Sequence, residues 1–302
     1  MKTKDQAMLF AAFAADALAL APHWIYDTRK LAKEFGRVSG FLKPAEDSYH
    51  FGKAQGEFTH YGDQMLVLLE SVAGSGGFQL DDFAQRWRRL FADYRGYVDQ
   101  ATRVTLENFA RGASPDDAGS TSNDLAGASR IVPLVLCYRH DLDALVRASR
   151  MQTQMTHNHP EVIEAAEFFA RVLWQVLHGQ PPLAAIQDVA ANAATGISLA
   201  QWVEEGRQLA TLDSVAAVGQ LGQNCHAPHA FPAVIQLIAR HEDNLAEALI
   251  ESVMAGGDSA ARGILVGAVL GAHLGWEAIP SEWIAGLKHG ATLSSLADTL
   301  MQ

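Results

Sequence analysis

The stretch GGDSAARGILVGAVLGAHL, residues 256–274, decides the fold. Its alanine and leucine content predicts a helix over residues 260–274 that begins just after two glycines. Gly263, Gly267 and Gly271 recur four residues apart, so they share one side of that helix. A glycine has no side chain to hold a neighbour away, and we therefore expect another helix to approach closely on this side. Asp258 either caps the helix or presents a carboxylate to a site.

Helical periodicity also dominates the rest of the chain. Further helices are predicted over residues 97–109, 125–137, 142–155, 160–177, 183–194, 232–240, 244–254 and 293–301, and around the apolar positions of 66–72 and 83–94. No segment alternates as a strand does, and no long linker or fixed-period repeat divides the chain. The sequence predicts an all-α protein, a single helical domain over residues 1–302.

Composition excludes several classes of function. The 302 residues are 49% hydrophobic and 19% charged, with a formal net charge of −11, so nonspecific binding to nucleic acid is not expected. The two cysteines, Cys137 and Cys225, do not form a disulfide framework. The apolar run 7–21 is interrupted by Asp16 and is too short to span a bilayer. We expect a cytoplasmic protein with no membrane partner.

Polar residues gather in the segments between helices, where catalytic and binding residues are often found. Residues 16–27 contain His23, and residues 56–64 contain Glu57, His60, Tyr61 and Asp63. Residues 120–124 contain Ser122 and Asp124, residues 156–159 contain His157, and residues 224–229 contain Asn224 and Cys225. The spacing of Cys225 and its neighbouring histidines does not match a structural zinc site.

Several of these segments resemble motifs of the ADP-ribosylglycohydrolase family, in the family's order and over nearly the whole chain. They are AADALA at 14–19, the apolar stripe that follows Met65, ASRIVPL at 128–134, Thr156-His157, GGDS at 256–259 and IPSEW at 279–283. The resemblance implies an orthogonal bundle of many helices with a cleft between its loops. In relatives that cleft holds two Mg²⁺ or Mn²⁺ ions and cleaves the bond at C1″ of an ADP-ribosyl group.

The departures from the family pattern fall on the metal ligands. His23 stands where the family has a glutamate, Tyr61 and Gly62 stand in place of an aspartate pair, and Ala260 and Ala261 replace an aspartate and a threonine. Mg²⁺ requires oxygen ligands, chiefly carboxylates. We therefore predict that the binuclear Mg/Mn site of the family is lost and that no cofactor takes its place. If a single metal ion binds, Asp258, Asp63 and His60, with His23, are the candidate ligands, and imidazole favours a transition metal.

These residues predict an altered hydrolase that acts on an N- or O-glycosidic bond of a small ribosyl or nucleoside-like substrate. Asp258 or Asp63 is the expected base or stabilising carboxylate, His60 or His23 the expected acid, and Glu57 a further catalytic candidate. The candidate substrate-binding residues are Ser122, Asp124, His157, Asn224, Cys225 and Tyr61. ADP-ribosyl-arginine should be a poor substrate, because the predicted site lacks the metal ions that orient the ribose in relatives.

Two alternatives remain open at this stage. In the first, the protein is a catalytically inactive homologue that binds a ligand or serves a structural role. In the second, Cys225 is the nucleophile of a cysteine-dependent transferase or hydrolase.

Overall fold

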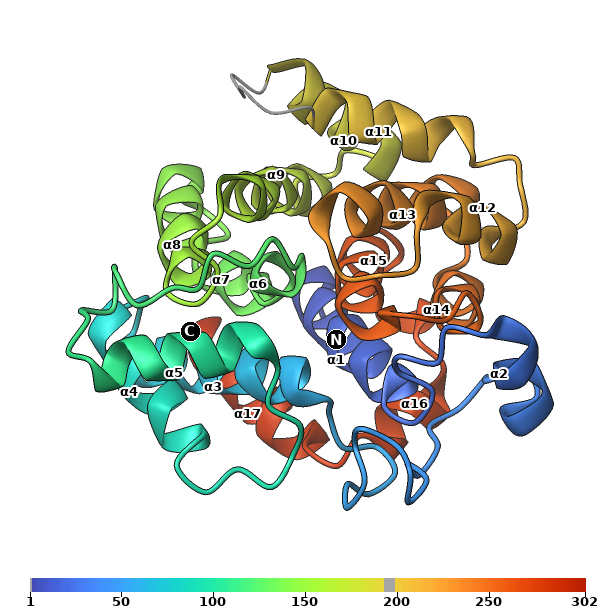
Figure 1. The fold of residues 1–302 in the computed structure, drawn as a ribbon. Coiled ribbons are helices and arrows are strands. Elements are labelled where there is room, and N and C mark those ends of the chain that lie inside the picture. Colours follow the sequence, from blue (N-terminus) through green and yellow to red (C-terminus); the bar gives the residue numbers. More distant parts are fainter. Residues whose placement is uncertain (1, 193–198) are drawn as a thin grey trace.

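Two antiparallel helices from opposite ends of the chain form the centre of the molecule. They are α1 (Lys4–Ala19) and α15 (Ser259–Leu274), and both are buried along nearly their whole length. The computed structural model describes residues 2–192 and 199–302. Figure 1 shows the two helices lying in the middle of the fold, with the other helices around them.

Glycines on α15 make this pairing close. A Cβ atom added to Gly267 would lie 2.6 Å from the carbonyl oxygen of Ala11, and one added to Gly271 would lie 2.7 Å from that of Ala7. The predicted close approach of a second helix is therefore confirmed at these two positions. Gly263 is less crowded, since its added Cβ would meet the Cβ of Ala15 at 3.5 Å. The order of these contacts places the end of α1 beside the beginning of α15.

The other helices surround this pair. In chain order they are α2 (Thr28–Phe35), α3 (His60–Ser75), α4 (Leu80–Leu90), α5 (Gln100–Ala110), α6 (Ala126–Ser129), α7 (Val132–Cys137), α8 (Leu142–Gln154), α9 (Pro160–Leu177), α10 (Pro182–Asn192), α11 (Leu199–Gln208), α12 (Ser214–Leu221), α13 (Ala227–Arg240), α14 (Leu245–Met254), the 3₁₀ turn η1 (Trp276–Ala278), α16 (Ser281–Gly286) and α17 (Gly290–Leu300). Helices α9, α13 and α14 pack on α15, while α3 and α7 contact α1. One continuous apolar core joins α1 to α17.

The architecture is all-α, as the sequence predicts. Extended pairing in the described residues is limited to two isolated bridges, Ser120 with His157 and Asp124 with His226. None of the helices in the described ranges combines the length and the apolar character needed to cross a membrane.

Several predicted boundaries were wrong. The helix predicted over 125–137 is broken into α6 and α7 at Arg130 and Ile131, and Pro133, which cannot donate a backbone hydrogen bond, lies in the first turn of α7. The helix predicted from Pro232 begins five residues earlier, with Pro228 in its first turn and Pro232 inside it. The short helices α2, α11, α12 and α16 were not predicted. The predicted end at Ala194 lies outside the described residues.

The close contact between α1 and α15 predicts different effects for two similar substitutions. Gly271→Ala should destabilise the protein by about 2 kcal/mol or more, because the new methyl group would overlap backbone atoms of α1. Gly263→Ala on the same helix should be neutral or stabilising, since its methyl group has room and alanine favours helix. Urea unfolding of both variants would measure the difference, and equal stabilities would contradict the packing argument.

Candidate functional site

Asp258 lies at the N-terminus of α15, where the chain makes a tight turn. Its Oδ1 accepts a hydrogen bond from the Ala261 backbone N–H at 3.2 Å, so it caps the helix. Gly256 and Gly257, with φ of 70° and 65°, shape the turn, and a Cβ on Gly257 would lie 2.1 Å from the Gln223 carbonyl oxygen. That carbonyl accepts the Asp258 N–H at 2.8 Å, so the 222–226 segment is held against the carboxylate.

The loop that carries Asp124 is tied to the same segment. Its Leu125 N–H donates to the Cys225 carbonyl at 2.9 Å, and the Ala227 N–H donates to the Asn123 carbonyl at 2.9 Å. These two bonds hold Asp124 beside Cys225. The Asp124 carboxylate also accepts the Ala126 N–H at 2.9 Å, which fixes its orientation.

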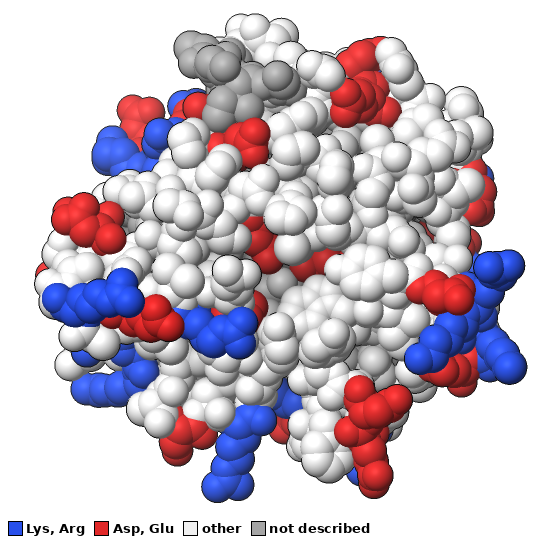
Figure 2. Space-filling model, in the orientation of Figure 1, with Lys and Arg blue, Asp and Glu red and all other residues white. Residues whose placement is uncertain are grey.

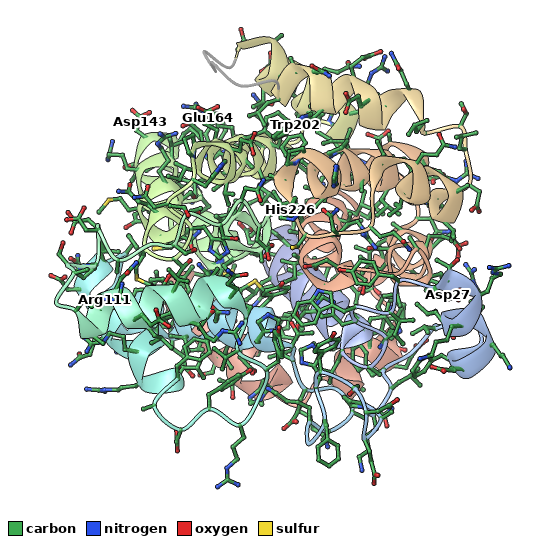
Figure 3. The ribbon with its side chains drawn as sticks, viewed as in Figure 1. Asp27, Arg111, Asp143, Glu164, Trp202 and His226 are labelled. Carbon is green, nitrogen blue, oxygen red and sulfur yellow. The ribbon has the colours of Figure 1, made fainter. Side chains whose placement is uncertain are left out.

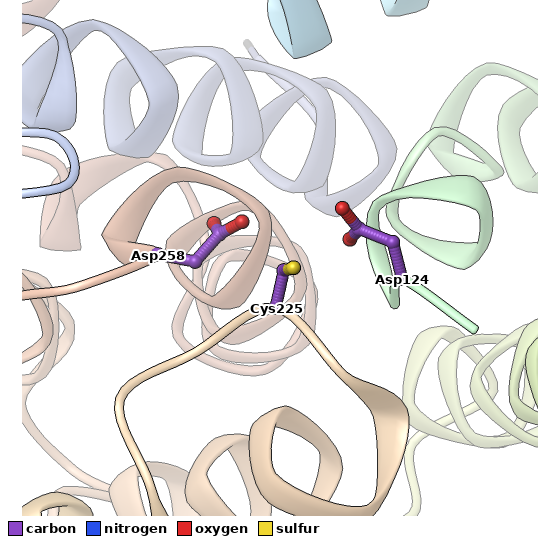
Figure 4. A group of neighbouring side chains, drawn as sticks. All are labelled: Asp124, Cys225 and Asp258. Atoms are coloured by element: carbon purple, nitrogen blue, oxygen red, sulfur yellow. The ribbon is translucent and has the colours of Figure 1, made fainter. Parts of the chain in front are cut away.

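Asp124, Cys225 and Asp258 form one cluster, with one side-chain O or S atom of each within 4.8 Å of the others. Figure 4 shows the two carboxyl groups facing each other with the thiol between them. On the surface, Figure 2 shows a hollow near the middle of the face, with acidic side chains at its floor. Burial raises the pKa of Asp258. Burial and then the charge of Asp258 raise the pKa of Asp124 well above its usual range.

Tyr61 joins this cluster from α3. Its hydroxyl donates a hydrogen bond to Asp258 Oδ2 at 3.0 Å. The beginning of α3 is held by α1, because the Thr59 N–H and hydroxyl donate to Asp16 at 2.7 and 2.6 Å. Gly62 leaves space for this contact, since a Cβ there would lie 2.3 Å from Asp16 Oδ2. Burial raises the pKa of Tyr61 well above its usual value, so it stays a neutral donor.

Next to Tyr61 lies a group of buried histidines. His60 packs on the Tyr61 ring with centroids 3.9 Å apart, and its Nε2 lies 3.3 Å from Asp99 Oδ2. Burial, and then the charges of His50 and His60, lower the pKa of His23 well below its usual value. Burial therefore favours the neutral form of the His23 ring, and its predicted role as the acid stays a prediction.

Asp99 and His50 were not identified from the sequence. Asp99 caps α5 and accepts the Thr102 N–H at 2.7 Å. Burial would raise the pKa of Asp99, but the bonds from His60 and Thr102 outweigh it and hold the pKa below its usual range. The spacing of Asp99 and Thr102 before a helical pattern was the available signal, and it indicated only a cap. His50 lies in no motif, and its ring stacks on His23 with centroids 5.4 Å apart.

Two predicted catalytic residues have local partners. Glu57 Oε2 accepts the Ala54 N–H of its own turn at 2.6 Å. Asp63 is paired with Lys53 and accepts the Tyr94 hydroxyl. Both side chains are thus already engaged, and their predicted catalytic roles stay predictions.

The remaining predicted substrate-binding residues also have partners. Ser122 Oγ accepts the Asp124 N–H at 3.2 Å, and Asn224 bonds the ring of His229 and the N–H of His226, which Figure 3 labels. His157 is buried, with Nδ1 2.9 Å from Thr156 Oγ1, and burial lowers its pKa to about 3. Of the site residues predicted from the sequence, the structure brings together Asp124, Cys225 and Asp258, with Tyr61 bonded to Asp258.

Comparison with known proteins gives matches over the whole chain. The family model for ADP-ribosylglycohydrolase matches residues 2–302. Crystallin J1A of Tripedalia cystophora is 26% identical, with 99% of this chain and 96% of the crystallin covered. An uncharacterized protein of Archaeoglobus fulgidus is also 26% identical, with 100% and 97% covered. A solved structure described as an ADP-ribosylglycohydrolase-related protein complex superposes with a TM-score of 0.75 at 25% identity, over 98% of this chain and 97% of that one.

The donor atoms of the cluster do not fit two Mg²⁺ or Mn²⁺ ions. The cluster offers two carboxylates and one thiol, which can supply ligands for one cation. Mg²⁺ prefers oxygen donors in octahedral geometry, and a thiol suits softer ions. The positions that resemble the family's other ligands hold a phenol at Tyr61, an imidazole at His23 and apolar methyl groups at Ala260 and Ala261.

Metal titration tests this conclusion. Ions that bind a folded protein at one hundred times their Kd stabilise it by about 2.7 kcal/mol, which raises Tm by several degrees. We expect millimolar Mg²⁺ or Mn²⁺, added after EDTA treatment, to leave Tm unchanged. A clear rise in Tm with either ion, saturating at two ions per chain, would show that the binuclear site persists.

Cys225 should react slowly with alkylating agents. Burial and the charges of Asp124 and Asp258 raise the pKa of its thiol, so little thiolate is present at neutral pH. We expect iodoacetamide to label Cys225 at pH 7 more slowly than it labels free cysteine, measured by mass spectrometry on the Cys137→Ser protein. Fast labelling would support the cysteine-dependent alternative.

Proposed function

The chain belongs to the ADP-ribosylglycohydrolase family, and from this premise we propose that it hydrolyses a glycosidic bond with a carboxyl pair, Asp124 and Asp258, in place of two metal ions. The observation that carries the proposal is the meeting of these two side chains, each with an oxygen within 4.8 Å of the other. Carboxyl pairs of this kind cleave glycosides in many hydrolases.

The surroundings of the two carboxyl groups favour different roles. Asp258 caps the sixteen-residue helix α15, whose N-terminal dipole favours a negative charge, and it accepts the Tyr61 hydroxyl as well. Asp124 accepts one backbone N–H and lies beside the charge of Asp258. Since two adjacent carboxylates in a buried site resist ionising together, Asp124 holds the proton and Asp258 the charge.

The reaction then proceeds as an acid-assisted cleavage. Asp124 donates its proton to the leaving nitrogen or oxygen as the bond to C1 breaks, and ionised Asp258 stabilises the positive charge that develops on the sugar. Water then adds to C1 and returns a proton to Asp124.

Substitution of either carboxyl group tests the proposal. Asp124→Asn and Asp258→Asn should each lower kcat/KM at least about 100-fold, because one removes the acid and the other the stabilising charge. A panel of nucleosides and nitrophenyl glycosides provides the assay. Asp143→Asn, which neutralises an exposed carboxylate in the first turn of α8, is the matched control and should leave kcat/KM unchanged.

The pH dependence has a defined sign. In the unsubstituted protein kcat/KM should fall as pH rises through the raised pKa of Asp124, since the acid loses its proton. Turnover that persists in both Asn variants would place the reaction elsewhere. A ligand that raises Tm without any turnover across the panel would favour the inactive, ligand-binding alternative.

A further inference from the structure

A cavity of about 260 Å³ is lined by aromatic and acidic side chains. Its aromatic members are His23, Trp24, Tyr26 and Tyr49, and its acidic members are Asp27, Glu34 and Asp47. The volume is below the ~300–1,000 Å³ of pockets for drug-sized ligands, so it suits one flat ring system. Asp27 caps α2 at the edge of the ribbon in Figure 3.

The segment that lines one side of the cavity is bonded to the turn that precedes Asp258. The Trp24 N–H donates to the Gly257 carbonyl at 2.9 Å, and the Gly257 N–H donates to the Ile25 carbonyl at 2.9 Å. The backbone of residues 24–25 is therefore bonded to the residue just before Asp258. Tyr26 also lines the cavity, and burial, then the charges of Asp258, Cys225 and Asp124, raise the pKa of its hydroxyl to about 12. His23 and Trp24, which line the cavity, have ring centroids 5.7 and 6.4 Å from that of Tyr61, and the Tyr61 hydroxyl donates to Asp258, so Tyr61 connects the cavity lining to this carboxyl group.

The Trp24 ring packs edge to face against two tyrosine rings. Trp24 meets Tyr49 edge to face at a centroid distance of 4.9 Å and Tyr97 at 4.8 Å. Tyr49 is 56% exposed, so this ring is available to a ligand. Trp24 has φ of 66°, the one positive value among the described residues other than glycine, and such strain costs roughly 1–3 kcal/mol. The neighbouring contacts hold the indole in this position despite that cost.

The charges around the cavity are unfavourable to a phosphate group. The lysine among its lining residues, Lys30, is paired with Glu34 at 3.6 Å. Two buried arginines bond mainly to the protein: Arg262 donates to the carbonyls of Ser252 and Gly256, and Arg130 bonds Gln64 and Thr156, while Arg262 Nη1 and Arg130 Nε have no hydrogen-bond partner. A diphosphate here would face Asp27, Glu34 and Asp47 together with the carboxyl pair.

We propose that this cavity binds the flat aglycone of an unphosphorylated nucleoside-like substrate, uncharged or cationic, by stacking on Tyr49 and Trp24, and that it rejects diphosphate-bearing ligands such as ADP-ribosyl groups. The proposal rests on the hydrolase function above for the position of the bond to be cleaved. Stacking on aromatic rings tolerates different bases, and the surrounding carboxylates select against anions and favour cations.

Equilibrium binding of three probes that share a ribose tests the proposal by calorimetry. They are inosine, a ribosylpyridinium and inosine 5′-diphosphate. We expect the pyridinium and inosine to bind at least about ten times more tightly than the diphosphate, with a smaller ratio at high salt. The stacking contribution predicts that Tyr49→Ala weakens inosine binding about tenfold. Phe51→Ala should not, because Phe51 is 60% exposed on the same loop but does not line the cavity.

A charge substitution gives an independent measurement. Asp47→Lys places a cation at an exposed position of the lining and should improve binding of inosine 5′-diphosphate relative to inosine. Diphosphate that binds the unsubstituted protein as tightly as inosine would overturn the proposal, as would inosine binding that is insensitive to Tyr49→Ala. If the three probes bind with the expected order of affinities but none of them is hydrolysed, this inference is upheld and only the proposed hydrolase function is refuted.

Discussion

The contact between Gly267 and Gly271 of α15 and the backbone of α1 is the constraint on which the rest of the structure depends. Because the backbones touch, any side chain at either glycine would separate the two helices. The antiparallel arrangement brings the end of α1 to the beginning of α15. Asp16, near the end of α1, then anchors the first turn of α3 through Thr59. One helix pair thus sets the relative positions of Asp258 and Tyr61, although they are 197 residues apart in sequence.

The site built on this frame balances its negative charge with protein groups. The family resemblance implies that two dications neutralise the carboxylates in relatives. Here the charge of Asp258 is stabilised by a phenol, a backbone N–H and the dipole of a buried helix. Burial outweighs these partners, so the pKa values of both carboxyl groups are raised. A carboxyl group that holds its proton near neutral pH is the requirement for acid catalysis without a metal.

The fold and the site differ in how far the sequence could predict them. Helical periodicity and the glycine spacing are local patterns, and they correctly predicted an all-α protein with a close helix pair. Asp258 and Tyr61 were identified because they stand at positions of the family motifs. The partners of Glu57 and Asp63 could not be predicted, because the turn around Ala54 and the contacts of Lys53 and Tyr94 depend on the folded loop. Asp99 and His50 matched no motif, and only packing places them beside His60 and His23.

The acidity of the cleft links the proposed chemistry to the proposed choice of substrate. Burial and then the charge of Asp258 raise the pKa of Asp124, and the negative field of Asp258 also opposes any ligand that carries phosphate. A phosphorylated substrate would bring further negative charge to the pair and would be held by no unpaired lysine of the cavity lining. A flat cation would be attracted by the carboxylates and by the aromatic rings of Trp24 and Tyr49. The proposed replacement of a metal site by a carboxyl pair and the proposed exclusion of diphosphates therefore have one electrostatic cause.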